Sequence, residues 1–238
     1  MNFILLILLI FSPPQKMQTL KYNTVARLHN ISDPSGICQA GKNFYIANDK
    51  GGLFEVDGLG KILNHKLMGW DNEDICTVNG KLYMMDESGR RVFVVDTGSL
   101  KIDAEHPLNY AGPRNLGFES LAYIADKHEF VAVSEKQPSL LVVFDENFNV
   151  ITQFPLPGLS DVSGATYYNN ALWILSDEDH VIWKVDEDKL NPDDFTVEKK
   201  WNIPIYNPEG ICFDTDGTMR IVSDQCRRLY IFPNPEQQ

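Results

Sequence analysis

The sequence predicts an all-β fold in which similar sheets form a ring, that is, a five-bladed β-propeller with four-stranded blades. The first observation is a short phrase that recurs along the 238 residues, in the copies DPSGIC, DNEDIC, GFESLA, DVSGAT and NPEGIC. Its equivalent points, Gly36, Asp74, Ser120, Gly164 and Gly210, lie 38, 46, 44 and 46 residues apart, which is the length of a propeller blade. The second observation is that short runs of β-branched and aromatic residues alternate with Gly, Asn and Asp, which favours strands over helices. A β-sandwich would share this strand spacing but would not explain the repeat.

Each copy opens an innermost strand, and further strands follow it in a constant order. In the second copy DICTV ends at an Asn-Gly dipeptide, which is favoured in hairpin turns, and LYMMDE, VFVVD and an outer strand near Ile102 come next. The fourth copy turns at Asn-Asn and continues with LWILSDE, VIWKVD and an outer strand around residues 197–203. The fifth copy supplies one strand fewer before the chain ends. We therefore expect residues 21–29, upstream of the first copy, to complete the last blade and close the ring.

The repeat also predicts the domain organisation. Residues 20–238 are expected to form a single domain, because one repeated sheet cannot bury both of its faces alone and no linker interrupts the copies. Residues 3–11 are continuously apolar and precede Ser12, Pro13 and Pro14. This run is too short to cross a bilayer as a helix, so we interpret residues 1–19 as an export signal peptide or a short membrane anchor. The interpretation predicts a protein of the cell envelope, either periplasmic or associated with the plasma membrane.

The charge of the chain limits its partners. A formal net charge of −12 argues against nucleic-acid binding, because neutralising phosphates needs clustered Lys and Arg. It favours cations or cationic partners, although an excess of acid can also serve only to keep an exported protein soluble. We expect the protein to be a monomer.

The four cysteines do not form an evident disulfide framework. Cys38, Cys76 and Cys212 occupy one position of the repeat, which is Ala122 and Thr166 in the other two copies. A free cysteine at such a position behaves as a small hydrophobic residue. Cys226 falls in a loop without an obvious partner, so its disulfide state is left open.

Acidic residues recur where the innermost strands begin. Counting from the turn centres places Glu73 opposite Asp86, Glu119 opposite Glu135, Glu209 beside Ser223 and Asp224, Ser35 near residues 47–49, and Ser163 opposite Ser176. All five pairs fall on one face of the ring. Because the innermost strands line the channel, we expect Glu73, Glu119 and Glu209 to converge at its mouth as metal ligands. Around them would lie the acids Asp49, Asp86, Glu87, Glu135, Asp177, Glu178 and Asp224.

Converging carboxylates need compensation. Two ionised carboxylates about 6 Å apart repel each other by roughly 3 kcal/mol at an effective dielectric constant of 20. A bound cation, a raised pKa or ample water could each relieve this repulsion. Ca²⁺ suits the site because it accepts several oxygen ligands in flexible geometry, whereas Zn²⁺ would need nearby His or Cys. The alternative is that the three glutamates are solvated or hydrogen-bonded to backbone amides and hold no metal.

Basic residues follow these acids along the chain. Lys50, Arg90, Arg91, Lys136, Arg227 and Arg228 could form rim salt bridges between blades, or could help a metal grip a phosphate, carboxylate or sugar acid. The predicted ligand-binding residues are Asp49, Glu87, Arg90, Arg91, Glu135, Lys136, Asp177, Asp224 and Arg227. His180, in a loop of the fourth copy, is the one histidine expected near the mouth and is a weak candidate for a catalytic base.

The phrases DPSGIC, NDKGGLFEVD, GFESLAY, VSEKQPSLL, DVSGATY and PEGICFDTDG resemble the SdiA-regulated family of bacterial envelope proteins. The resemblance covers the chain after about residue 20. It implies a five-bladed propeller with a calcium site, distantly similar to NHL-repeat propellers and associated with the membrane through its N-terminus. By position it assigns the calcium ligands to Glu119, Glu209 and Glu73, although Asp74 stands where the family often has glycine. Gluconolactonase-like and paraoxonase-like propellers are similar only in placing a Glu of an EG phrase on calcium.

Two functions compete on this basis. The first is a non-enzymatic calcium-binding propeller that presents its acidic mouth to a small anionic ligand or a protein partner. The second is a calcium-dependent hydrolase of a lactone or phosphoester, which would need a positioned base that the sequence does not clearly supply. A scaffold with an empty mouth is a third, weaker option. The sequence favours the first.

Overall fold

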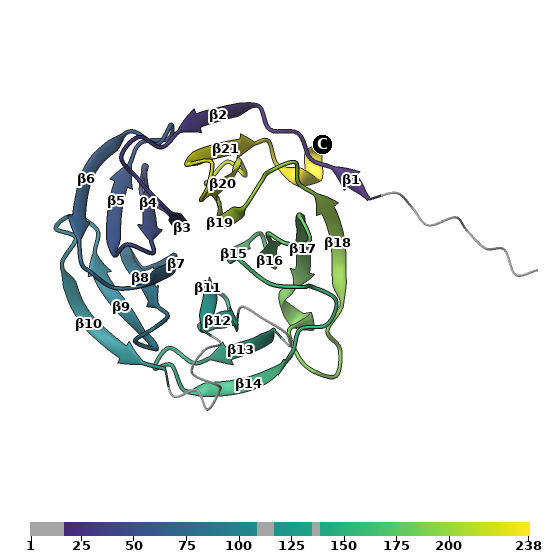
Figure 1. The fold of residues 1–238 in the computed structure, drawn as a ribbon. Coiled ribbons are helices and arrows are strands. Elements are labelled where there is room, and N and C mark those ends of the chain that lie inside the picture. The colour runs from purple at the N-terminus through teal and green to yellow at the C-terminus, as the bar shows by residue number, and fades with distance from the viewer. Residues whose placement is uncertain (1–16, 109–116, 135–138) are drawn as a thin grey trace, which may run out of the picture.

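The computed structural model describes residues 17–108, 117–134 and 139–238, and they form a five-bladed β-propeller as predicted (Figure 1). Blade 1 contains β3 (Pro34–Ala40), β4 (Asn43–Asn48), β5 (Gly52–Val56) and β6 (Ile62–Leu67). Blade 2 contains β7 (Asn72–Val78), β8 (Lys81–Asp86), β9 (Arg91–Asp96) and β10 (Ile102–Pro107). Blade 3 contains β11 (Phe118–Ile124), β12 (Glu129–Ser134), β13 (Leu140–Phe144) and β14 (Val150–Pro155).

The second half of the chain continues the pattern. Blade 4 contains β15 (Gly164–Tyr168), β16 (Ala171–Ser176), β17 (Val181–Asp186) and β18 (Val197–Asn202). Blade 5 contains β19 (Pro208–Phe213), β20 (Met219–Ser223) and β21 (Arg228–Phe232). Short 3₁₀ turns, η1 (Glu187–Lys189) and η2 (Pro235–Gln237), follow β17 and β21. The first strand of each repeat, β3, β7, β11, β15 or β19, faces the centre of the ring (Figure 1).

The N-terminal part of the described chain closes the ring. The strand β2 (Thr24–Arg27) pairs antiparallel with β21 and becomes the outer strand of blade 5, which confirms the predicted closing segment. A shorter strand, β1 (Gln18–Thr19), adds in parallel to β18 at the edge of blade 4 and was not predicted. The chain start therefore spans two neighbouring blades and covers sheet edges that would otherwise be open to other chains.

The hydrophobic core lies between the blades rather than within them. Each cluster of buried side chains joins neighbouring sheets, as where Leu53 of blade 1 packs with Met84 and Phe93 of blade 2. Between blades 4 and 5, Trp173 is fully buried and stacks on Trp201 with ring centroids 5.3 Å apart. Both faces of the sheets are therefore covered by their neighbours in the ring.

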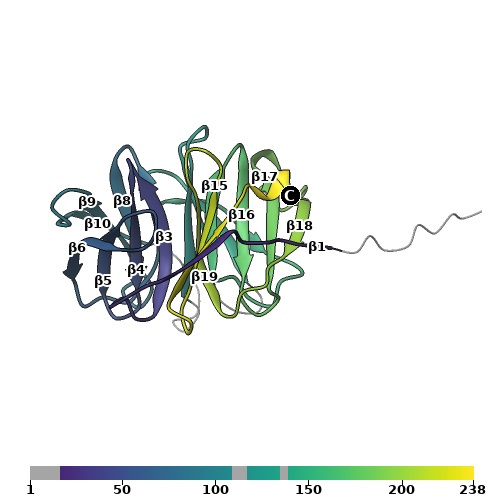
Figure 2. The same cartoon turned by 90° about the horizontal axis from the view of Figure 1, so that it is seen from above.

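The blades stand side by side when the ring is seen edge on, so the channel has two ends on opposite sides of the molecule (Figure 2). The inner strands all begin toward the same end, because each blade repeats the same order of strands. No helix among the described residues is long and apolar enough to cross a membrane. The apolar run 3–11 lies outside the described residues.

Candidate functional site

One end of the channel opens into a cavity of about 300 Å³, which we call the acidic cavity. It is lined by Ser35, Asp49, Glu73, Glu119, Asp161, Val162, Ser163, Asp177, Glu178, Glu209 and Asp224. All five blades contribute to this lining. The structure therefore brings the three predicted metal-ligand glutamates together at one end of the channel, along with three of the acids predicted to bind ligand.

β-bulges shape the inner strands that carry these glutamates. The ladders begin with the pairs Asn72↔Asp86, Phe118↔Ser134 and Pro208↔Ser223, and each register shifts within the next three residues. The predicted pairing of Glu73 with Asp86 is therefore wrong, because Asn72 takes that place, whereas Glu209 directly follows the partner of Ser223. An extra residue in a bulge leaves the ladder and re-aims its side chain. The bulges explain how a glutamate at the start of each of these strands turns into the channel.

The residue after the Ser or Glu of the repeated phrase lies where the inner strands come closest. A Cβ atom added at Gly210 would lie 2.5 Å from the Ser35 carbonyl oxygen, and one at Gly164 would lie 2.4 Å from the Glu209 carbonyl oxygen. Such distances leave no room for a side chain at these two glycines, which explains the small residue in the repeated phrase. The inner strands thus form a narrow waist beneath the acidic cavity.

Asp74 is the one long side chain at this waist. It is 1% exposed, and its carboxylate accepts hydrogen bonds from the backbone amides of Ile75 and Leu121, each at 2.8 Å. The second bond links blade 2 to blade 3. Burial raises the pKa of Asp74 well above its usual value, and these amide bonds act against that rise. Where the related phrase has glycine, this chain therefore places a carboxylate that ties blades together.

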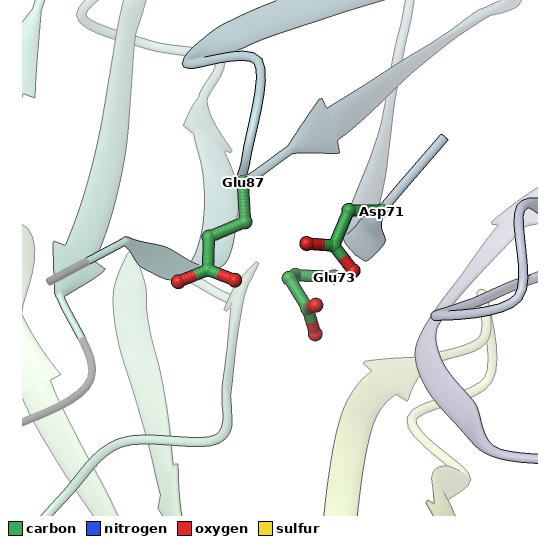
Figure 3. Close-up of side chains that lie close together, drawn as sticks. All are labelled: Asp71, Glu73 and Glu87. Carbon is green, nitrogen blue, oxygen red and sulfur yellow. The ribbon is translucent and has the colours of Figure 1, made fainter. Parts of the chain in front are cut away.

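Three carboxylates converge on the blade 2 side of the acidic cavity, and of these Glu73 is among its lining residues whereas Asp71 and Glu87 are not (Figure 3). Asp71, Glu73 and Glu87 each offer an oxygen, and these oxygens all lie within 4.8 Å of one another. We call these residues the Glu73 group. Burial, followed by the charges of Glu119 and Asp49, raises the pKa of Glu73 to about 10. The pKa of Asp71 is also raised, first by burial.

A second set of acids faces the Glu73 group from blades 4 and 5. Burial, and then the charges of Asp177 and Asp224, raises the pKa of Glu209 to about 9. Burial and a hydrogen bond with Asp177 raise the pKa of Asp161 to about 7. One carboxylate oxygen of Asp177, Oδ1, is buried without a hydrogen-bond partner. We call Asp161, Asp177, Glu209 and Asp224 the Glu209 group.

Two of these acids were missed by the sequence reasoning. Asp71 and Asp161 are both the first residue of their copy of the repeated phrase, a position that was not predicted to bind a ligand. The signal was present, because Asp33 opens a third copy in the same way. In blade 1, however, Asp33 forms an ion pair with Lys50 at 3.4 Å and is not among the residues that line the cavity.

The donor atoms of the acidic cavity fit a hard cation. Its described lining offers carboxylates and serine hydroxyls but no His or Cys, which argues for Ca²⁺ and against Zn²⁺. Calcium binds oxygen at about 2.3–2.6 Å, so two ligands of one ion lie at most about 5 Å apart. The spacing of the Glu73 group meets this limit. The buried Oδ1 of Asp177, which has no hydrogen-bond partner, is a further oxygen that a cation could coordinate.

The sequence model of the SdiA-regulated family matches residues 15–233. The chain belongs to the SdiA-regulated family. No curated protein matches this family member at a significant level. Its fold is similar to that of Myxococcus xanthus glutaminyl cyclase, with a TM-score of 0.73 and 12% identity over 90% of this chain and 95% of the other. It is also similar to Kuenenia stuttgartiensis hydrazine synthase, with a TM-score of 0.55 and 11% identity over 85% and 84% of the two chains. At these identities the likeness shows the fold alone.

The described basic residues of this SdiA-regulated protein are not among the residues that line the acidic cavity. Arg91 binds the buried Asp86 at 2.8 Å and Glu105 at 3.3 Å, and its guanidinium lies 4.3 Å from the centre of the Trp70 ring. No Lys or Arg occurs among the described residues that line the cavity. Both acidic partners of Arg91 belong to blade 2, so its salt bridges lie within one blade rather than between blades.

The remaining predicted site residues are placed as follows. Glu87 belongs to the Glu73 group, whereas Arg90 and Arg227 occupy positive-φ positions in loops and are not among the lining residues. His180 is exposed in the loop after β16 and is likewise not among them. Glu135 and Lys136 lie outside the described residues.

Proposed function

We propose that this protein is a calcium-binding propeller of the cell envelope whose acidic cavity holds one Ca²⁺ ion and presents it to a ligand or partner. The observation that carries the proposal is the convergence of three carboxylate oxygens in the Glu73 group within 4.8 Å of one another. Glu73 is the central ligand, and Asp71 and Glu87 complete the set on blade 2. Among the neighbouring charges, that of Glu119 raises the pKa of Glu73 most.

Protonation and calcium binding compete in this cavity. Without a cation, the raised pKa of Glu73 and Glu209 keeps both carboxyls protonated at neutral pH. A bound Ca²⁺ supplies the opposite charge, lowers the pKa of the carboxyls and displaces their protons. Binding should therefore release protons and strengthen as the pH rises.

The ligand of the bound ion would be anionic. The described lining offers no basic side chain, so an anion entering the cavity would meet carboxylates unless it coordinates the calcium directly. Calcium accepts up to eight oxygen ligands, and three carboxylates leave positions for a carboxylate or phosphate of a small molecule or a protein segment. Arg90, Arg91, Lys50 and Arg227 would act only on parts of the ligand that extend beyond the rim.

A calcium-dependent hydrolase of a lactone or phosphoester is the second candidate. The observation that favours it is Asp161, a carboxyl of the same cavity whose pKa is raised to about 7 and which could therefore exchange a proton near neutral pH. His180, the base suggested by the sequence, is exposed and does not line the cavity. The hydrolase reading would thus depend on Asp161 rather than His180.

Thermal melting with calcium and with a chelator tests the proposal. A ligand that binds only the folded state stabilises it by RT ln(1 + [L]/Kd), which is about 2.7 kcal/mol at 100 times the Kd. Glu73→Gln should abolish this stabilisation. Glu129→Gln, at the opposite end of blade 3, is the matched control and should retain it. If calcium leaves the melting temperature of the wild-type protein unchanged, the proposal fails.

A further inference from the structure

The opposite end of the channel holds a cavity of a different chemical kind. It has a volume of about 130 Å³, and no Asp, Glu, Lys, Arg or His occurs among its described lining residues. Three of the lining residues are Cys38, Cys76 and Cys212. We call this space the thiol cavity. The narrow waist at Asp74 separates it from the acidic cavity.

The three cysteines come from three consecutive blades of the ring. Cys212 is on β19, Cys38 on β3 and Cys76 on β7, and β3 packs against both of the other strands. All three occupy the same position of the repeated phrase, so they stand at one level of the channel. Cys38 is the middle one and has a thiol-bearing neighbour on either side.

Packing does not require a thiol at this level. The same position is Ala122 in blade 3 and Thr166 in blade 4, and both line the same cavity. None of the three cysteines is in a disulfide. Cys38 and Cys212 are 6% and 3% exposed, whereas Cys76 is partly exposed and gives access from outside. Three free thiols therefore line one cavity where packing alone does not require them.

The environment suits a soft metal ion rather than a hard one. A neutral cavity offers nothing to Ca²⁺ or Mg²⁺, which need anionic oxygen ligands. Burial raises the pKa of Cys38 to about 12, so its sulfur becomes a thiolate only when a metal displaces the proton. The Thr77 hydroxyl lies 2.9 Å from the Gln39 carbonyl oxygen and 3.3 Å from the Cys38 sulfur, so its one proton would have to turn from the carbonyl to the sulfur to stabilise a thiolate.

The arrangement also limits the coordination number. Among the described residues, the Glu73 group is the set of three potential ligands whose donor atoms lie within 4.8 Å of one another, so the three sulfurs are more widely spaced. A tetrahedral Zn²⁺ site would need four close ligands. An ion that accepts two thiolates in a linear geometry needs only one pair, and Cys38 has two possible partners.

We propose that the thiol cavity binds a soft monovalent metal ion of the copper(I) or silver(I) class, held by Cys38 together with Cys76 or Cys212. Soft thiolate ligands select Cu(I) over hard cations. On binding, two S–H bonds break, two metal–sulfur bonds form and two protons leave to solvent. The metal is neither oxidised nor reduced.

Anaerobic titration with Cu(I), buffered by a competing Cu(I) chelator, tests the proposal. The wild-type protein should take one ion per chain from the chelator and show thiolate-to-metal absorption in the near ultraviolet. Cys38→Ala should lower the Cu(I) affinity by at least about 100-fold, because loss of even an outer partner of a metal ligand costs about 10- to 100-fold. Cys226→Ala, in the loop next to the acidic cavity, is the matched control and should bind as the wild type does.

The design separates loss of the site from loss of the fold. Because Ala122 and Thr166 fill the same position in other blades, Cys38→Ala and Cys38→Thr should both melt close to the wild-type temperature. Neither should change the calcium-dependent melting shift, since that depends on the other end of the channel. Wild-type protein that fails to compete with the chelator, Cys38 variants that bind normally, or a Cys226 variant that loses the metal would each overturn the proposal.

Discussion

Removing calcium should make the stability of this protein fall as the pH rises. Glu73 has a folded-state pKa of about 10 and an ordinary unfolded-state value near 4.5, so between these values the folded state holds a proton that the unfolded state does not. Stability is then fully present below pH 4.5 and is lost toward pH 10. The slope is about −1.4 kcal/mol per pH unit for one such carboxyl, or a loss of roughly 3 kcal/mol between pH 6 and pH 8. Glu209, with a pKa of about 9, adds up to the same amount again.

Urea unfolding at several pH values, in chelator and in saturating calcium, measures this slope. In chelator the free energy of unfolding should fall by about 3–5 kcal/mol from pH 6 to pH 8, and calcium should remove most of the fall. Glu73→Gln mimics the protonated carboxyl, so it should reduce the slope by about half, leaving the contribution of Glu209, without lowering stability at pH 6. Glu129→Gln should leave the slope as it is. A calcium-free stability that is level or rises across this range would refute the reasoning, because it would mean that neither glutamate retains its proton.

Further predictions concern the fold. Trp173→Ala should lower the free energy of unfolding by about 3–5 kcal/mol in urea, because a fully buried ring is removed from the interface of blades 4 and 5; a loss under 1 kcal/mol would contradict that packing. Asp74→Ala should cost at least about 2 kcal/mol by leaving the amides of Ile75 and Leu121 without partners, and Asp74→Asn should cost less because its one side-chain oxygen can still accept one of the two bonds; equal losses would show that both carboxylate oxygens are needed. Deleting the chain through residue 29 should expose the edge of β21 and cause self-association in light scattering, whereas deleting it through residue 16, which keeps both β1 and β2, should not; a monodisperse shorter chain would show that β2 does not close the ring.

The fold follows from the sequence because each blade repeats the same constraints. An inner strand that must approach its neighbours closely requires a small residue at Gly36, Gly164 and Gly210, and this requirement is visible as the repeated phrase. The same reasoning located the closing strand, since the last copy lacked an outer strand. The strand β1 left no such trace, because two residues paired by backbone alone to β18 carry no side-chain pattern.

The candidate site was predictable in its location but not in its detailed geometry. Counting from a turn assumes one residue opposite another, and the bulges at the start of β7, β11 and β19 break that assumption. The prediction therefore found Glu73 but assigned its neighbours incorrectly, and Asp71 was overlooked. The sequence of the basic loops does not show which way their side chains point. Arg91 could equally contact a ligand or pair with Asp86, and in the structure it pairs with Asp86.

The two ends of the channel should act independently because Asp74 lies between them. Its carboxylate accepts hydrogen bonds from amides of blades 2 and 3 at the level where the inner strands come closest. It therefore links these two blades at the waist. Carboxylate oxygens line the cavity on one side of it and thiols the cavity on the other, so the two proposed cation sites would select a hard and a soft ion without competing. If so, the effects of Glu73→Gln on calcium binding and of Cys38→Ala on Cu(I) binding should be additive in the double variant. A coupling of 1 kcal/mol or more between them, measured as a shift in either affinity, would show instead that the waist transmits strain between the ends.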